Sequence, residues 1–120
     1  MKQAVKVLRQ FHRKNSFDAI AFTGTSGAAL AYPLSYLLGV PLICVRKSIR
    51  DNHFGSKLEG YVTAKKYIIV DDFVQSGKTI NGINKSIKLE NKKANCVGIY
   101  LYDQPYKINS FKDIPVIKNV

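Results

Sequence analysis

The chain has 120 residues and a mass of 13.5 kDa, which is enough for one compact domain. Hydrophobic residues make up 46% and aromatic residues 11% of the sequence, so disorder along the whole chain is excluded. Lys and Arg number 19 against eight Asp and Glu, giving a net charge of +11. This excess favours anionic partners such as phosphorylated metabolites, pyrophosphate or nucleic acid.

The terminal sequence and the cysteines indicate the cellular compartment. The sequence shows no apolar run of membrane-spanning length, and we expect no secretory leader, because the start MKQAVKVLRQFHRKN is an amphipathic basic helix without the apolar segment that a leader needs. Cys44 and Cys96 lie in apolar, strand-like runs without a metal-ligand spacing. We therefore expect a cytoplasmic protein with buried free thiols and no contact with a membrane.

Helical and strand-like patterns alternate along the chain. The predicted helices are 2–14, 26–38 and 77–92, and the predicted strands are 18–23, 41–46, 67–71, 96–101 and, in the tail, 114–117. The helix 26–38 is apolar nearly all round and contains Pro33, which predicts a bend. Residues 48–60 read as a long loop or a loose hairpin. Repeated strand–helix–strand units with β-branched strands predict an α/β fold, a Rossmann-like parallel sheet with helices on both faces.

Much of the positive charge falls on one side of two predicted helices. The cations repeat at helical spacing at Lys6, Arg9 and Arg13 and again at Lys85, Lys88 and Lys92. Apolar residues lie opposite them at the same spacing, which is typical of a solvated helix face. A nucleic-acid surface is the less favoured interpretation.

Small, polar and charged residues follow the predicted strands. They are TGTSG (23–27), RK (46–47), DDFVQSGKT (71–79) and YDQ (102–104). Ligands of open parallel sheets bind beyond the carboxyl ends of the strands. The sequence therefore predicts a binding site where these four segments meet.

The segment YIIVDDFVQSGKTI, residues 67–80, carries the strongest chemical signal. Asp71 and Asp72 end an apolar strand, and a small loop then opens a helix, whose backbone N–H groups favour a phosphate dianion. Ser76 and Thr79 add hydroxyl donors, and Gly77 lets the chain approach a ligand closely. The carboxylates suit sugar hydroxyls and Mg²⁺, directly or through water, so the segment describes a pocket for a ribose 5-phosphate.

Two other interpretations of this segment are open. A nucleoside-triphosphate P-loop requires glycine where Asp72 stands, and an acidic side chain there would repel the phosphates. A strand that ends in exposed acids before a capped helix would carry no ligand at all.

Residues 67–80 resemble the phosphoribosyl-pyrophosphate (PRPP) motif of type I phosphoribosyltransferases, and supporting resemblance runs from Asp18 to Leu101. The resemblance implies transfer of ribose 5-phosphate from PRPP to a purine or pyrimidine base, with Mg²⁺ and release of pyrophosphate. It implies a PRPP-binding set of Asp71, Asp72, Gln75, Ser76, Gly77, Lys78 and Thr79. Asp71 and Asp72 would also face the metal. Gln75 stands where hypoxanthine-guanine enzymes typically have an aspartate, a proposed base, and because Gln75 cannot take a proton the resemblance argues against 6-oxopurine chemistry by the usual route.

Two further segments are similar to loops of this family. Residues 22–47 look like the pyrophosphate loop, helix and strand of adenine enzymes, which implies pyrophosphate binding by Thr25, Ser26, Gly27, Arg46 and Lys47. Residues 46–60 resemble the mobile catalytic loop of orotate enzymes. That similarity implies catalytic roles for Lys47, Arg50 and His53. A solvent-exposed hairpin with an idle histidine is the alternative.

The hood, the subdomain that covers the base in this family, has little sequence to form it. With the core over 18–101, only 1–17 and 102–120 are available for a minimal hood, where Tyr102, Tyr106 and Phe111 are the candidates to stack on a base. The resemblance implies a homodimer. A PRPP- or nucleotide-binding regulator without turnover is the second interpretation, and a basic nucleic-acid-binding protein is the third.

Overall fold

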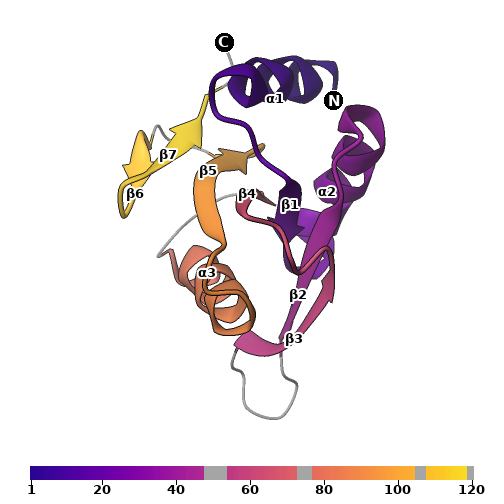
Figure 1. Cartoon of the computed structure of the whole chain (residues 1–120). Coiled ribbons are helices and arrows are strands. Elements are labelled where there is room, and N and C mark those ends of the chain that lie inside the picture. Colours follow the sequence, from indigo (N-terminus) through magenta and orange to yellow (C-terminus); the bar gives the residue numbers. More distant parts are fainter. Residues whose placement is uncertain (48–53, 73–76, 105–107, 119–120) are drawn as a thin grey trace.

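The computed structural model of the chain describes residues 1–47, 54–72, 77–104 and 108–118, with Lys47 and residues 54–57 described by their backbone alone. Its centre is a sheet in the order β3-β2-β1-β4-β5-β7-β6 (Figure 1). The strands are β1 (Ala19–Phe22), β2 (Leu42–Lys47), β3 (Phe54–Gly60), β4 (Lys66–Asp71), β5 (Asn95–Leu101), β6 (Ser110–Phe111) and β7 (Ile114–Ile117).

The middle of this sheet is parallel, as the sequence predicts. Strands β2, β1, β4, β5 and β7 pair in parallel, and the strands at both edges, β3 and β6, pair antiparallel to their neighbours. The predicted alternative of a hairpin after 41–46 is therefore confirmed for residues 54–60. An antiparallel edge strand can be short and polar because only one of its long sides is paired and much of it meets water.

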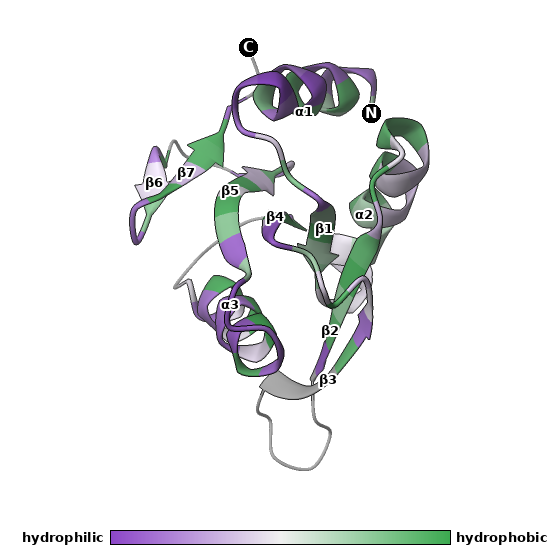
Figure 2. Cartoon of the chain, in the orientation of Figure 1, coloured by the Kyte–Doolittle hydropathy of each residue, from purple (hydrophilic) through white to green (hydrophobic). Residues whose placement is uncertain are grey.

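In the part of the chain that the structure describes, three helices cover the two faces of the sheet. They are α1 (Lys2–Lys14), α2 (Gly24–Leu38) and α3 (Lys78–Glu90). Helices α1 and α2 bury Ile20 and Ile68 on one face, and α3 buries Ala21 and Ile69 on the other, because neighbouring residues of a strand point to opposite faces. The hydrophobic colouring of Figure 2 is concentrated on these central strands and the helix sides that meet them. The predicted α/β fold with helices on both faces is confirmed.

Helix α2 begins earlier than predicted, at Gly24 instead of residue 26, and it runs on past Pro33. Gly24 has a φ of +69°, and its small polar neighbours give the helix start the sequence of a loop. Gly27 is buried where α2 crosses β1: a Cβ added there would lie 3.2 Å from the Cβ of Phe22. The missing side chain thus lets the helix pack closely on the strand.

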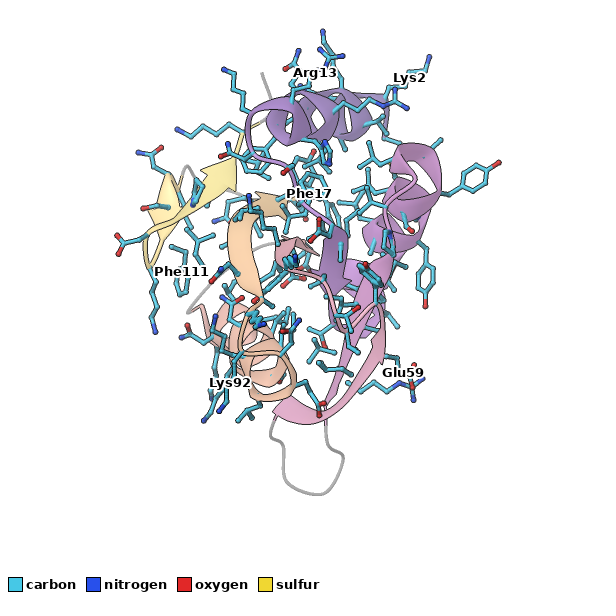
Figure 3. All side chains as sticks on the ribbon, viewed as in Figure 1. Lys2, Arg13, Phe17, Glu59, Lys92 and Phe111 are labelled. Carbon is cyan, nitrogen blue, oxygen red and sulfur yellow. The ribbon has the colours of Figure 1, made fainter. Side chains whose placement is uncertain are left out.

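The two basic stripes are exposed, as the sequence predicts. On α1, Lys6, Arg9 and Arg13 are exposed while Val7 and Leu8 are buried, and α3 shows the same division. Figure 3 shows Lys2 and Arg13 pointing away from the body of the protein. Among the described residues, no helix combines the length and apolar character needed to span a bilayer.

The terminal segments join the core layers. Helix α1 packs against α2 and β7, and β7 extends the sheet beside β5. Of the described residues in 1–17 and 102–118, which the sequence offers for a minimal hood, none lines the cavity described below. Cys44 and Cys96 are free but half-buried. Burial raises the pKa of the Cys96 thiol to about 12, so it stays protonated at neutral pH.

The Asp18 carboxylate ties the start of β1 to the start of β4. Its Oδ2 accepts hydrogen bonds from the backbone N–H groups of Lys65 (2.8 Å) and Lys66 (3.1 Å), and these bonds lower the pKa of Asp18. Because the folded-state pKa is lowered, this stabilisation is present above the ordinary aspartate pKa of about 4 and is lost as the pH falls through the lowered value.

The Asp18→Asn variant is therefore expected to lose stability at neutral pH only. The loss should be about 1 kcal/mol, since the bonds to the charged oxygen are exposed to water. Thermal melts of both proteins between neutral pH and about pH 3 measure it. A difference that stays constant over this range would show that the charge of Asp18 has no part in it.

Candidate functional site

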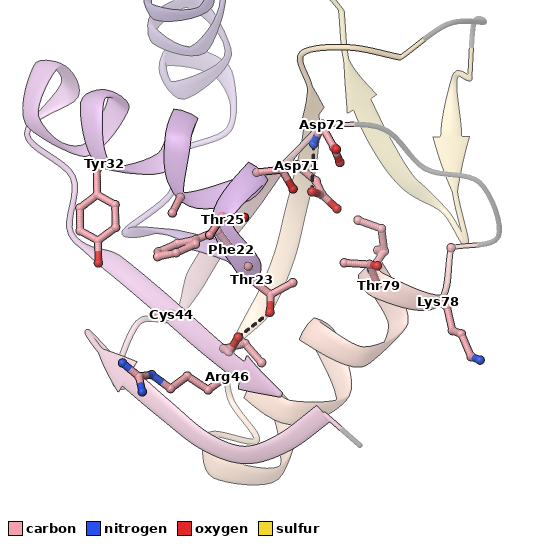
Figure 4. A pocket seen from close by; sticks show the side chains of 16 residues that line it. Phe22, Thr23, Thr25, Tyr32, Cys44, Arg46, Asp71, Asp72, Lys78 and Thr79 are labelled. Atoms are coloured by element: carbon pink, nitrogen blue, oxygen red, sulfur yellow. Dashed lines mark hydrogen bonds between the residues drawn. The ribbon is translucent and has the colours of Figure 1, made fainter. Parts of the chain in front are cut away.

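A cavity of about 690 Å³ opens at the carboxyl ends of β1, β2 and β4 (Figure 4), a size usual for small-molecule sites. Its described lining consists of Phe22, Thr23, Gly24, Thr25, Ser26, Ala28, Tyr32, Cys44, Val45, Arg46, Asp71, Asp72, Gly77, Lys78, Thr79 and Ile80. Described residues of the segments 23–27, 46–47 and 71–79 thus line one cavity, as the sequence predicts. Of 102–104, no residue lines it.

One wall of the cavity is the first turn of α2, called the α2 turn here (residues 24–27). The Thr23 hydroxyl donates a 2.6 Å hydrogen bond to the backbone oxygen of Val45, which joins the ends of β1 and β2 just before this turn. Thr25 and Ser26 are exposed and line the cavity, whereas Gly27 does not line it because it packs against Phe22. The first N–H groups of a helix lack acceptors within the helix, so this wall offers donors to an anion.

The opposite wall is the first turn of α3, called the α3 turn here (residues 77–80). Gly77 has a φ of +75°, and the first helical bond runs from the N–H of Asn81 to the Gly77 oxygen at 2.9 Å. The N–H groups of Lys78, Thr79 and Ile80 therefore precede the hydrogen-bonded turns of the helix. Two helix starts face a single cavity, and the positive ends of both dipoles act on whatever binds there.

Asp71 ends β4 and Asp72 follows it, between these two turns, with Thr25 on one side and Thr79 on the other in the view of Figure 4. Asp71 is buried and Asp72 half-buried. The N–H of Asp72 donates to Oδ1 of Asp71 at 2.9 Å, and the backbone oxygens of the pair accept from the N–H groups of Tyr102 (3.2 Å) and Asp103 (2.8 Å). This bonding fixes the backbone of the acid pair at the mouth of the cavity.

The described positively charged side chains near the cavity do not point at the acid pair. Arg46 lines the cavity, but its Nε lies 3.3 Å from Oε1 of Glu59 on β3. Lys78 points away from the acid pair in Figure 4. Lys47 is the last residue of β2, which places its backbone at the cavity end of the strand. Its side chain lies outside the described residues, as do Arg50, His53, Gln75, Ser76 and Tyr106.

Three features of the site were missed by sequence reasoning. Tyr32 and Cys44 line the cavity, and the Tyr32 ring meets Phe22 edge-on with centroids 5.5 Å apart. Helical spacing offered a signal for Tyr32, because Ala28 and Tyr32 lie four residues apart on α2. The third feature is the placement of the base-stacking candidates: Tyr102 and Phe111 contact the α2 and α3 turns, and neither lines the cavity.

Residues 1–107 match the family model described as the phosphoribosyl transferase domain. The orotate phosphoribosyltransferase of Pyrobaculum islandicum is 28% identical over 89 residues, which are 73% of this chain and 46% of that protein. The chain spans about half the length of the curated relatives it matches.

Solved structures share the fold. The adenine phosphoribosyltransferase of Thermoanaerobacter pseudethanolicus aligns with a TM-score of 0.64 at 20% identity, over 86% of this chain and 67% of that one. The orotate phosphoribosyltransferase of Aeropyrum pernix aligns with a TM-score of 0.61 at 18% identity, over 82% and 55%. With the fold of type I phosphoribosyltransferases and a family match over most of its length, the chain belongs to the phosphoribosyl transferase domain family.

Proposed function

We propose that this protein transfers ribose 5-phosphate from PRPP to a nitrogen of a nucleobase and releases pyrophosphate. One observation carries the proposal: a single cavity places two helix starts on opposite sides of a pair of carboxylates. PRPP has two anionic ends, a 5-phosphate and a pyrophosphate, joined by a ribose with hydroxyl groups. Each end then meets a helix start, and the ribose meets the acids between them.

The assignment of the two ends follows the sequence resemblance. The α3 turn binds the 5-phosphate through its backbone N–H groups and the Thr79 hydroxyl. The α2 turn binds pyrophosphate through its backbone N–H groups, with Thr25 and Ser26 at the cavity surface. Arg46 lies near the end of β2, beside the pyrophosphate turn, and the backbone of Lys47 ends the same strand. Lys47, Arg50 and His53 are proposed to stabilise the departing pyrophosphate.

The acid pair suits Mg²⁺ only together with substrate. Among the described residues, no group of three or more metal-ligating side chains gathers, so Asp71 and Asp72 do not form a closed metal cage. Mg²⁺ usually keeps several waters and binds one or two carboxylates plus substrate phosphates, which this pair fits. When bound, the metal would neutralise charge on pyrophosphate. The carboxylates themselves hold the ribose hydroxyls and orient C1 toward the base.

A second candidate is a protein that binds PRPP or a nucleotide and transfers nothing. One observation supports this candidate: none of the described terminal residues lines the cavity, where a hood would cover the base. The expected homodimer and cytoplasmic location stay predictions in either case.

Ligand binding and turnover on the same protein separate the two candidates. We expect PRPP with Mg²⁺ to raise the thermal midpoint, because the ligand binds only the folded state. Pyrophosphate release is then measured with a panel of bases that begins with orotate and adenine, the bases named for the relatives. A PRPP shift with no release on any base selects the regulator. A shift with ATP and none with PRPP contradicts both.

A further inference from the structure

We propose that the C-terminal segment (described residues 102–104 and 108–118) positions both anion-binding turns, Tyr102 holding the α2 turn and Phe111 holding the α3 turn. The inference rests on the proposed function, because it assigns the two turns to the two ends of PRPP. Neither residue lines the cavity, so both act through the backbone they contact.

Tyr102 follows the last residue of β5, and its side chain reaches the α2 turn. Its hydroxyl donates a hydrogen bond of 2.9 Å to the backbone oxygen of Ser26, in the α2 turn. Its own N–H is bonded to the backbone oxygen of Asp71, so the ring starts from the fixed end of the sheet.

Phe111 occupies the place of a side chain at Gly77. A Cβ added to Gly77 would lie 1.8 Å from Cζ and 2.1 Å from Cε2 of the Phe111 ring. The ring edge therefore rests directly on the backbone where the α3 turn begins. Sequence reasoning assigned the small size of Gly77 to the approach of a phosphate, and the structure shows that it also admits this ring.

A tight hairpin holds Phe111 in place (Figure 3). Phe111 on β6 pairs with Ile114 on β7, and the two residues between them, Lys112 and Asp113, have φ values of +47° and +68°. Positive φ at both positions is the geometry of the two-residue turns that match the twist of paired strands. Because β7 is itself bonded to β5, the ring is tied to the central sheet.

The two contacts fall on opposite sides of the acid pair and thus on different halves of the ligand. A loosened α3 turn should weaken binding of the 5-phosphate alone, and a loosened α2 turn should weaken binding of pyrophosphate alone. General destabilisation would weaken both equally. The contrast between two partial ligands therefore distinguishes positioning from a purely structural role.

The test uses calorimetric titration of ribose 5-phosphate and of pyrophosphate with Mg²⁺ into the parent protein and its variants. Phe111→Ala is expected to lower the affinity for ribose 5-phosphate about fivefold and to leave the affinity for pyrophosphate unchanged. Tyr102→Phe is expected to lower the affinity for pyrophosphate about fivefold and to leave that for ribose 5-phosphate unchanged. Each variant removes one contact of ordinary strength. Tyr36→Phe, at an 87% exposed tyrosine of α2, is the control and should change neither affinity.

Phe111→Leu keeps an apolar side chain against the core without the ring edge, and it replaces Phe111→Ala if that variant does not fold. The inference is overturned if either variant lowers the affinity for both ligands equally. It is also overturned if a variant leaves unchanged the affinity for the ligand whose turn it is expected to loosen. A parent protein that binds neither partial ligand refutes the proposed function, and the inference falls with it.

Discussion

The Gly77→Ala variant is expected to lower the free energy of unfolding by about 3 kcal/mol. About 1–2 kcal/mol of this comes from placing a Cβ at a φ of +75°, a conformation that side chains rarely adopt. A further 1–3 kcal/mol, roughly, comes from displacing the Phe111 ring from the space that the Cβ takes. Urea unfolding followed by circular dichroism measures the total.

Gly39→Ala is the matched control for this change. Gly39 follows the last residue of α2 and caps the helix with a φ of +68°, but a Cβ added there has nothing within 4 Å. Gly39→Ala should therefore lower the free energy of unfolding only by the backbone strain, about 1–2 kcal/mol. In addition, Phe111→Ala should recover part of the loss in the Gly77→Ala background but none in the Gly39→Ala background. Equal costs at the two glycines would mean that the Phe111 contact has no energetic weight.

The central strands and the helices could be predicted because their local sequences and their surroundings agree. The strand YIIVD is apolar and β-branched, and the sheet buries it on both faces, so no tertiary effect opposes its propensity. The acid pair and the small loop after this strand could be predicted for the same reason, since the end of a buried parallel strand is a fixed place in the fold.

The edge strand β3 could be predicted only as one of two alternatives, a loop or a hairpin, and contacts between distant residues could not be predicted at all. The segment FGSKLEG contains two glycines and little hydrophobic alternation, and it is a strand because β2 offers it a partner. The contact of Phe111 with Gly77 and the bond of Tyr102 to Ser26 join residues far apart in the sequence. Neither leaves a local pattern, so aromatic residues in the tail could equally be read as base-stacking or packing residues.

The largest functional effect is expected from removing the charge of the acid pair. Asp72→Asn should weaken binding of PRPP with Mg²⁺ about 10- to 100-fold, because a neutral amide forms weaker hydrogen bonds to ribose hydroxyls and is a poor ligand for Mg²⁺. Asp71→Asn should weaken it as much and lower stability too, since the buried carboxylate accepts the N–H of Asp72 at 2.9 Å. Calorimetric titration and thermal melts of both variants separate binding from stability.

Asp103→Asn is the control for this charge effect. Asp103 is exposed and lies next to the pair, with its N–H bonded to the backbone oxygen of Asp72, but it does not line the cavity. Asp103→Asn removes one negative charge, as Asp72→Asn does, at nearly the same place. Its effect on the affinity for PRPP should be within about twofold, the size expected of a screened surface charge. If Asp103→Asn weakens PRPP as strongly as Asp72→Asn, the acids act only through the general field of the site. If neither does, they form the end of a strand and hold no ligand.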